Sequence, residues 1–455
     1  MVDVSIVWGR SSARGFLHRS RVTGWAEWVD PGRATGRLAG GATTIQGGAA
    51  VDGPGSRRAA RPDDPREPGV KWAPGLWRIG SHEAARQVLG ARGCTTQAGF
   101  TSEFVPKGRL KHHPILFSDG DLHDEQRRKV GRFFAPRVVT ERYRPLMVDA
   151  ADRLLAQAVA AGGCRVEDLA LLYSVDVTRQ VVGLTNSTVA GLAGRLVRFF
   201  NQPPFDITKP DLGRTRRQWA RAALNGLAPV VRLYLADVRP AIRARRRTPR
   251  EDVISHLIAE GYTDMDILVE CVTYGTAGMV TTREFIAMAL WHLLTDEDLR
   301  STYLAADQDG RIGVLEELIR LEPVVGHLYR RIREPLDVEH GSRTCHLQPG
   351  DLVDLQVRQT NTDPAAVGPD PMSLCPGRQL ARGVHPAGLS FGDGAHRCPG
   401  QALALLETDV LLTRMLDLDV TILAEPRIEW DDLVAGYCLR GFQLDLSARG
   451  AHPDR

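Results

Sequence analysis

A cysteine lies in a glycine-rich segment, FGDGAHRCPG at residues 391–400, directly before a run typical of a helix, QALALLE. The glycines allow the tight turns of a loop, and Pro399 suits the first position of a helix. A cysteine at the amino end of a helix has a lowered pKa, because the positive end of the helix dipole favours the thiolate. The pattern therefore favours a thiolate at Cys398, the form of cysteine that is needed to bind iron. A buried cysteine beside a glycine turn is the alternative.

Two further segments place charged side chains one helical turn apart. Glu317 and Arg320 in EELIR are spaced to share one face of a helix, and so are His123 and Arg127 in DGDLHDEQRRKVGRFFAPR. Two positive side chains on one face suit two carboxylates of a ligand. Taken alone, each pair is more typical of a solvated helix surface.

A long helical pattern, YGTAGMVTTREFIAMALWHLL, carries small and hydroxyl side chains near its start. Ala277 and Gly278 leave room beside such a helix, and the Thr281 hydroxyl can bind a ligand or relay a proton. Hydrogen bonds from Thr281 and Thr282 to the backbone of their own helix explain the pattern equally well.

Together and in this order, these segments resemble those of the cytochrome P450 family, in its soluble bacterial type. FGDGAHRCPG matches the FGxGxHxCxG haem loop at every specified position, EELIR matches ExxR, and AGMVTT is similar to the oxygen-binding helix. TNTDP at residues 360–364 resembles a further family segment, with Thr362 in place of arginine. The resemblance covers about residues 75–447 and excludes the amino-terminal part.

The resemblance implies haem b (iron protoporphyrin IX) as the cofactor, with Cys398 as the iron ligand. It implies haem contacts for His396, His123, Arg127, Phe391 and Arg330, with Arg331 as the alternative to Arg330, and a structural role for Glu317 and Arg320. It also implies that Thr281 is the catalytic hydroxyl. Ala277, Gly278, Val325 and the regions 99–110 and 199–205 are expected to line the substrate pocket.

The helix departs from the family pattern at Val280, where the family has Asp or Glu. Valine cannot relay protons, whereas Glu284 lies one turn later and could face the same way. Glu284 is therefore predicted as a catalytic residue beside Thr281. Water, a polar substrate and a different chemistry are the alternatives for proton supply, and a solvated surface position is the alternative for Glu284.

Amphipathic helical patterns dominate after Trp77, while LQPGDLVDLQV and GYCLRGFQLDLS alternate like strands. The expected architecture is mainly α with a smaller β portion, the cytochrome P450 fold. Residues 1–70 are rich in Gly, Ala, Arg and Pro and have little periodicity, so they are expected to form a flexible leader or to reflect a wrongly assigned start. A single haem-binding domain is expected over residues 71–455.

Composition excludes several classes of protein. The 58 basic and 55 acidic residues give a net charge of +3, which does not indicate nucleic-acid binding. The number of cysteines, seven, is odd, and they show no repeated short spacing, so the sequence indicates no disulfide framework. A reducing, cytoplasmic setting is therefore expected. No run approaches the ~20 apolar residues of a membrane-spanning helix, and no membrane anchor is expected.

The resemblance implies a monooxygenase that inserts one oxygen atom from O2 into a small organic substrate, in bacterial secondary metabolism. No flavin or nicotinamide domain is visible after Glu407, so electrons are expected from a ferredoxin and a ferredoxin reductase. The alternatives are a peroxide-using or oxidative-coupling enzyme, a noncatalytic haem-binding protein, and a zinc site. The zinc site would combine Cys375, His385, His396 and Cys398, although their spacing lacks the paired pattern of zinc modules.

Overall fold

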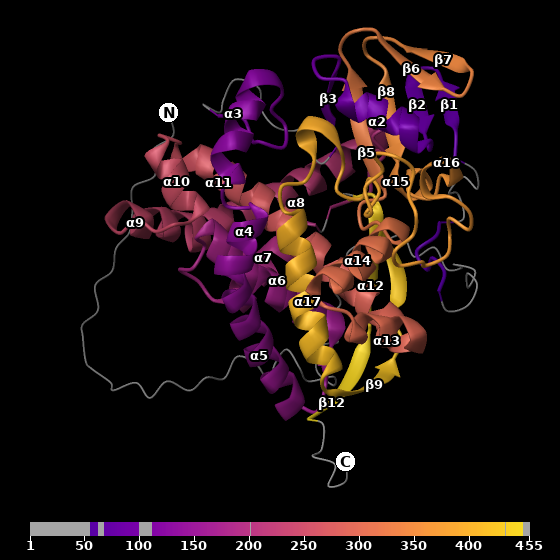
Figure 1. Ribbon diagram of the computed structural model, residues 1–455. Coiled ribbons are helices and arrows are strands. Elements are labelled where there is room, and N and C mark those ends of the chain that lie inside the picture. Colours follow the sequence, from indigo (N-terminus) through magenta and orange to yellow (C-terminus); the bar gives the residue numbers. More distant parts are fainter. Residues whose placement is uncertain (1–54, 62–67, 100–111, 201, 433, 449–455) are drawn as a thin grey trace, which may run out of the picture. The chain divides into compact units, whose positions relative to one another are not determined.

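The computed structural model describes residues 55–61, 68–99, 112–200, 202–432 and 434–448 (Figure 1). Helices form most of this part of the chain, which confirms the mainly α architecture. The α-helices are α2 (His82–Gly90), α3 (Gly120–Gly131), α4 (Pro136–Val138), α5 (Arg144–Ala160), α6 (Val166–Val182), α7 (Val189–Phe199), α8 (Arg216–Leu233), α9 (Arg239–Arg247), α10 (Val253–Ala259), α11 (Asp264–Gly275), α12 (Thr281–Thr295), α13 (Glu297–Ala305), α14 (Gln308–Leu321), α15 (Val357–Thr360), α16 (Pro364–Val367) and α17 (Gln401–Leu416).

Shorter helical turns and strands complete the fold. The π-helical turns are η2 (Val139–Tyr143), η4 (Tyr234–Val238) and η5 (Thr276–Val280), and the 3-10 turns are η3 (Pro210–Gly213) and η6 (Gly394–His396). The strands are β1 (Val70–Ala73), β2 (Leu76–Ile79), β3 (Thr95–Ala98), β4 (Cys164–Arg165), β5 (His327–Ile332), β6 (Leu336–His340), β7 (Arg343–Leu347), β8 (Leu352–Gln356), β9 (Asp419–Ala424), β10 (Arg427–Asp431), β11 (Gly436–Arg440) and β12 (Gln443–Ser447).

One sheet has five strands in the order β1-β2-β8-β5-β3. β8 runs parallel to β2 and antiparallel to β5, so that Val353 pairs with Trp77 on one side and with Arg330 on the other. Val353 and Leu389 belong to one buried apolar cluster together with residues of α2. The sheet therefore packs on α2 and on the residues that lead into the cysteine loop.

A long helix passes through the core. α11, η5 and α12 follow one another without a break, and every residue of α12 from Thr282 to Leu290 is buried. A helix that is buried on all sides belongs to the core, and here α6, α14 and α17 pack against it. The π-helical turn η5 lies in the segment AGMVTT; such turns are frequent at functional sites.

α17 is the helix that follows the cysteine loop, and it runs beside α12 and α14 (Figure 1). Tyr303 of α13 and Arg311 of α14 each donate to the carboxylate of Asp409 at 2.7 Å. The Tyr173 hydroxyl of α6 donates to the carbonyl of Glu407 at 3.0 Å. Polar contacts from three helices thus fix α17, and with it the end of the cysteine loop.

The pair Glu317 and Arg320 is buried and does not decorate a surface. Arg320 is 0% exposed and donates twice to the Glu317 carboxylate, at 2.7 Å each, and also to the carbonyls of Asn361 and Pro371. Arg378 also donates to Glu317, at 3.3 Å. The predicted structural role of the pair therefore has a concrete form: one buried guanidinium joins α14 to two distant loops.

Asn361 continues this network toward the cysteine loop. Its side-chain amide donates to Ser390 Oγ at 2.8 Å, and its side-chain oxygen accepts from the Leu389 backbone N–H at 2.7 Å. Gly388 has φ +56°, and a Cβ there would lie 2.3 Å from Asn361 Oδ1, so glycine is required at this close approach. The network ends at Ser390, the residue before the loop begins.

The first described residues already contact the core. Arg57 donates to the carbonyls of Leu321 and Arg358, and the backbone N–H of Ala59 donates to the Glu322 carboxylate. Arg57 and Ala59 belong to residues 1–70, the expected leader, so this described part of the leader packs against the core. Residues 1–54 and 62–67, which make up most of that leader, lie outside the described residues.

Other local expectations can be compared directly with the structure. The strand and helix expected from Trp77 onward are β2 and α2, and the strands expected near the carboxyl end are β11 and β12. Pro399 is not in the first turn of α17: the helix begins at Gln401, and Cys398 and Pro399 lie in the turn before it. Among the described residues, no helix combines the length and the hydrophobicity needed to cross a bilayer.

We predict that Arg320→Met lowers the free energy of unfolding by about 3–5 kcal/mol, because Glu317 is left buried without its main partner. Urea denaturation followed by circular dichroism measures the loss. Arg137→Met is the matched control, since Arg137 pairs with Glu141 on the surface and its removal should leave stability unchanged. Equal, small effects of both substitutions would contradict the structural role of Arg320.

Candidate haem site

The cysteine loop is held by its own backbone and by α2. The Cys398 N–H donates to the Phe391 carbonyl at 2.8 Å, which closes the loop on itself. Gly394 has φ +66°, and a Cβ there would lie 2.3 Å from the Leu89 carbonyl oxygen, so only glycine allows the loop to touch the end of α2. Asp393 accepts from Arg86 of α2 at 2.7 Å. These contacts fix where the sulfur lies.

The Cys398 side chain is exposed, although its surroundings exclude enough water to raise the pKa of the thiol. The Gly400 backbone N–H and the charges of Arg127 and Arg397 act in the opposite direction, lowering the pKa by stabilising the thiolate. The site thus favours sulfur as a ligand once a cation binds.

Four predicted haem-contacting residues lie close to one another and to the cysteine loop. The rings of His123 and His396 lie 4.1 Å apart, and Arg127, one turn after His123, donates to the Arg397 carbonyl. Burial, His396 and Arg127 lower the pKa of His123 to about 4. Arg330, on β5, is buried, and burial lowers its pKa to about 10.

Asp119 is the carboxylate in this cluster. His396 Nε2 lies 3.2 Å from Asp119 Oδ1, and the Thr96 hydroxyl donates to Oδ2. Burial raises the pKa of Asp119, but these two hydrogen bonds outweigh it and hold the pKa below its usual value. Asp119 also partly offsets the charge of Arg330.

The composition of the cluster tests whether haem fits. A buried guanidinium is costly unless it is paired. Among the described residues, Arg330 donates to the neutral carbonyl of Tyr329, at 2.8 Å. Arg127, Arg330 and the two imidazoles together form a set of hydrogen-bond donors. This set could bind more carboxylates than the one that Asp119 provides. Haem fits: its two propionates complement these donors, and Cys398 supplies a sulfur ligand.

The long helix has two accessible residues at and just after its π-helical turn. Ala277 is exposed and Thr281 is half-buried, although Met279, Val280 and the residues after Thr281 are buried. Ala277 and Thr281 are one turn apart and share one face of the helix. Thr281 Oγ1 donates a hydrogen bond to the Ala277 carbonyl. This is the bond to the helix's own backbone that the sequence left open as the alternative to ligand binding.

The other residues that were predicted to line the substrate pocket differ in their surroundings. A Cβ added to Gly278 would lie 3.4 Å from Thr178 Oγ1, so Gly278 allows close packing of the long helix against α6. Val325 is half-buried just before β5. Residues 100–110 and residue 201, from the two expected pocket regions, lie outside the described residues.

Glu284 has a set of partners that the sequence did not indicate. Its carboxylate accepts from the Leu439 backbone N–H at 2.9 Å, from Arg440 at 2.9 Å and from Arg283 at 2.7 Å. Burial alone raises the pKa of Glu284, but the two arginines reverse the shift and hold its pKa below the usual value. The contacts tie α12 to β11 and keep the carboxylate ionised.

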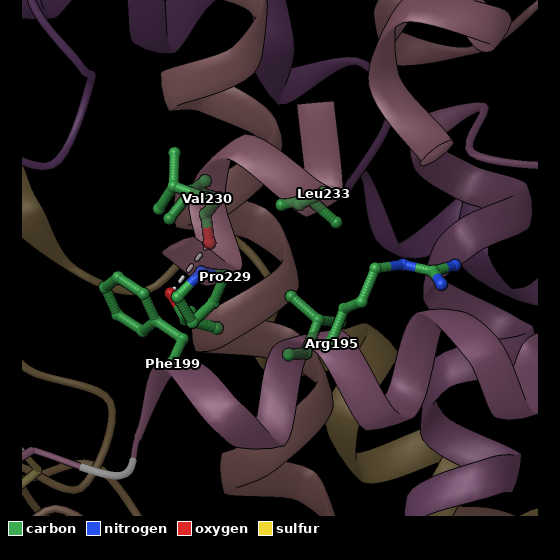
Figure 2. A pocket seen from close by; sticks show the side chains of 8 residues that line it. Arg195, Phe199, Pro229, Val230 and Leu233 are labelled. Atoms are coloured by element: carbon green, nitrogen blue, oxygen red, sulfur yellow. Dashed lines mark hydrogen bonds between the residues drawn. The ribbon is translucent and has the colours of Figure 1, made fainter. Parts of the chain in front are cut away.

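A shallow pocket lies between α7, α8 and the long helix (Figure 2). It is lined by Arg195, Leu196, Phe199, Pro229, Val230, Leu233, Val272 and Thr276. The Arg195 guanidinium points away from the pocket and pairs with Asp237 at 2.6 Å (Figure 2). Of the predicted pocket region 199–205, Phe199 reaches this pocket.

Several contributors could not be found from sequence motifs. Asp119, Asn361 and Arg378 act through contacts between distant segments. Two of them had a local signal: Asp119 starts the helix with His123 and Arg127, and Asn361 lies in the segment TNTDP. Within the described part of the chain, no three His, Cys, Asp or Glu side chains are placed to hold a metal ion together. Cys375, His385, His396 and Cys398, which were weighed as an alternative zinc site, do not form such a group.

Comparisons with known proteins agree with this site. The profile of the family "Cytochrome P450" matches residues 313–418, which include the Glu317–Arg320 pair and the cysteine loop. Cytochrome P450 130 of Mycobacterium tuberculosis is 30% identical over 338 residues, covering 70% of this chain and 74% of that protein. Nocardicin C N-oxygenase of Nocardia uniformis is 29% identical over 357 residues, covering 75% of this chain and 81% of that protein.

Solved structures show the same fold. The ligand-free structure of CYP164A2 from Mycobacterium smegmatis superposes with a TM-score of 0.66 at 25% identity, covering 83% of this chain and 93% of that one. The chain belongs to the cytochrome P450 family. It is a haem-binding P450 monooxygenase of the bacterial type.

We predict that Arg330→Gln weakens haem binding by about 10- to 100-fold, the equivalent of losing one or two charge-assisted hydrogen bonds. The rate of haem loss to an excess of a haem-scavenging protein measures the effect. Arg331→Gln is the matched control, because the Arg331 side chain bonds the exposed Gly350 carbonyl and should release haem at the wild-type rate. Faster loss from Arg331→Gln than from Arg330→Gln would reverse the assignment.

Proposed function

We propose that this P450 inserts one oxygen atom from O2 into a small organic substrate, with electrons delivered by a separate ferredoxin and its reductase. The observation that carries the proposal is the joint placement of Cys398 and the His396, Arg127 and Arg330 cluster. When bound, haem supplies the activation of O2, and a thiolate ligand promotes O–O cleavage. Cys398 holds the iron, His123, His396, Arg127 and Arg330 bind the propionates, and Phe391 packs beside the sulfur.

We propose that the substrate is oxidised beside Thr281, at the accessible face of the long helix. The Thr281 hydroxyl holds a proton at Oγ1 and can exchange the hydrogen bond to the Ala277 carbonyl for one to a ligand or to water. Ala277, Gly278 and Val325 are proposed to border the substrate. Since Glu284 is bound by Arg283, Arg440 and the Leu439 backbone, its proposed role is to anchor the helix and not to deliver protons.

The electron donor is proposed from charge. Arg397 lies beside Cys398 and donates to Gln401 at 2.9 Å, and Arg128 is an exposed residue of α3. Positive side chains near the sulfur attract an acidic redox protein such as a ferredoxin. A cytoplasmic setting and the haem-binding domain over residues 71–455 belong to the same proposal.

A role in secondary metabolism is proposed from the relatives. One relative is named nocardicin C N-oxygenase, and another, PikC of Streptomyces venezuelae, is a P450 monooxygenase that is 27% identical over 354 residues. These names describe those proteins and do not identify the substrate here. The second candidate function, a peroxide-using enzyme, is favoured by one observation: the buried Val280 stands where the family has an acid.

The oxidant that supports turnover, O2 or hydrogen peroxide, distinguishes the two candidate functions. We expect wild-type protein to consume O2 with NADPH, a ferredoxin and its reductase, and to oxidise members of a substrate panel faster than it does with hydrogen peroxide alone. Mass spectrometry of products formed under ¹⁸O2 provides the measurement. Products formed only with peroxide would favour the second candidate.

Thr281→Ala should divert electrons from product to released hydrogen peroxide in the ferredoxin-driven reaction, by about tenfold or more, because a positioned proton donor contributes at least that much. Thr273→Ala is the control, since the Thr273 hydroxyl bonds the Val269 carbonyl one turn earlier in the same helix. Unchanged peroxide release in Thr281→Ala would exclude the proposed role of Thr281.

A further inference from the structure

α8, η4 and α9 follow one another without a break and form one extended helix. A capping box of Thr215 and Gln218 starts it. On its inner face, Pro229 and Leu233 are buried and line the shallow pocket beside α7 (Figure 2). The helix is thus fixed by its cap and by this packing, and no residue of its opposite face takes part in the proposed function.

The outer face of this helix carries exposed apolar side chains. Ten large hydrophobic residues are exposed in the described part of the chain, and four of them belong to this one helix. These four form the apolar row: Leu224 (68% exposed), Leu227 (66%), Val231 (45%) and Leu235 (54%). Spacings of three and four residues place them on one face, opposite Leu233. Single exposed apolar residues are ordinary, whereas a row that spans about three turns is typical of an interaction surface.

Arginines border the apolar row. Arg221 and Arg232 lie about three helical turns apart, so they share one side of the row and form its arginine flank. Within the described ranges, no ion pair involves these two or six further exposed arginines of the same segment, Arg216, Arg217, Arg239, Arg243, Arg247 and Arg250.

The same segment offers almost no compensating negative charge. The acidic residue between Arg214 and Arg250 in the sequence is Asp237, which is buried and pairs with Arg195 at 2.6 Å. The outer face of the helix is therefore apolar along its middle and strongly positive around it.

An anionic lipid surface matches both features. Helices that lie in the headgroup region of a membrane combine a leucine-rich face with arginines, whose long stems let the charge reach the phosphates while the leucines enter the apolar layer. A second copy of the chain matches less well, because a two-fold contact would bring the arginines of both copies together. Leu and Val are also under-represented among the residues that carry most of the energy of protein–protein contacts.

We propose that the outer face of α8 and η4 binds to an anionic phospholipid surface. The apolar row enters the outer part of the acyl layer, and the arginine flank contacts the lipid phosphates. The exposed arginines of α9 add electrostatic attraction. The helix lies along the surface and does not cross it, so the contact is peripheral and reversible and weakens as the salt concentration rises.

Cosedimentation of the haem-loaded protein with lipid vesicles measures this contact. The wild type should bind vesicles of phosphatidylglycerol and phosphatidylcholine at least about tenfold more tightly than vesicles of phosphatidylcholine alone, since each arginine near an anionic surface contributes about fivefold. Equal binding to both kinds of vesicle overturns the proposal. Absence of binding to either kind also overturns it, and leaves the face to an acidic protein partner.

Two double variants test the two parts of the face. Arg221→Gln/Arg232→Gln should weaken binding to the anionic vesicles by about 25-fold, the product of two such contributions. Leu224→Gln/Leu227→Gln should weaken it by about tenfold or more, because two leucines no longer enter the apolar layer. All four side chains are exposed, so both variants should keep the wild-type haem absorbance spectrum.

Arg144→Gln and Leu423→Gln are the matched controls. Arg144 is exposed on α5 and Leu423 is 61% exposed on β9, so both lie outside the proposed face and should bind vesicles like the wild type. Equal losses in the controls and in the double variants, or double variants that bind like the wild type, exclude this face as the lipid contact.

Analytical ultracentrifugation without vesicles tests the second copy as the occupant. The wild type should sediment as a monomer at the concentrations used for cosedimentation. A dimer that dissociates in Leu224→Gln/Leu227→Gln would assign the apolar row to a second copy and overturn the lipid proposal.

Discussion

The buried guanidinium of Arg320 is the interaction on which the haem site depends. Arg320 joins Glu317 of its own helix to the carbonyls of Asn361 and Pro371, and Asn361 in turn holds Leu389 and Ser390. A charge so deeply buried is stable only while each partner is in place. The cysteine loop starts where this network ends, so the position of the sulfur follows from packing far from it.

Charge balance explains the second feature of the haem site, the cluster of arginines and histidines near Cys398. The protein gathers two arginines and two histidines near Cys398. Burial and repulsion from His396 and Arg127 lower the pKa of His123 to about 4, and burial lowers that of Arg330 to about 10. Asp119 offsets only part of this charge. A dianionic cofactor complements the cluster, which links haem binding to the stability of α3, β5 and the cysteine loop.

The sequence predicted the parts of the site whose signal is local. The cysteine loop and the Glu317–Arg320 spacing each lie within a few residues, and the mainly α fold follows from helical periodicity. The partners of Glu284 could not be predicted, because Leu439 and Arg440 lie on β11, more than 150 residues away. The early core contacts of Arg57 were missed for a related reason: a buried arginine in a Gly- and Pro-rich segment has no periodic signal. Strand order in the five-stranded sheet likewise depends on pairings between distant segments.

The ferrous carbon-monoxide difference spectrum of wild-type protein and Cys398→Ala tests the central claim most directly. Thiolate ligation through Cys398 predicts a strongly red-shifted absorbance band in the wild type that is lost in the variant, while Cys375→Ala, which changes an exposed cysteine elsewhere, retains it. A wild-type protein that binds no haem, or a thiolate band that persists in Cys398→Ala, would contradict the account.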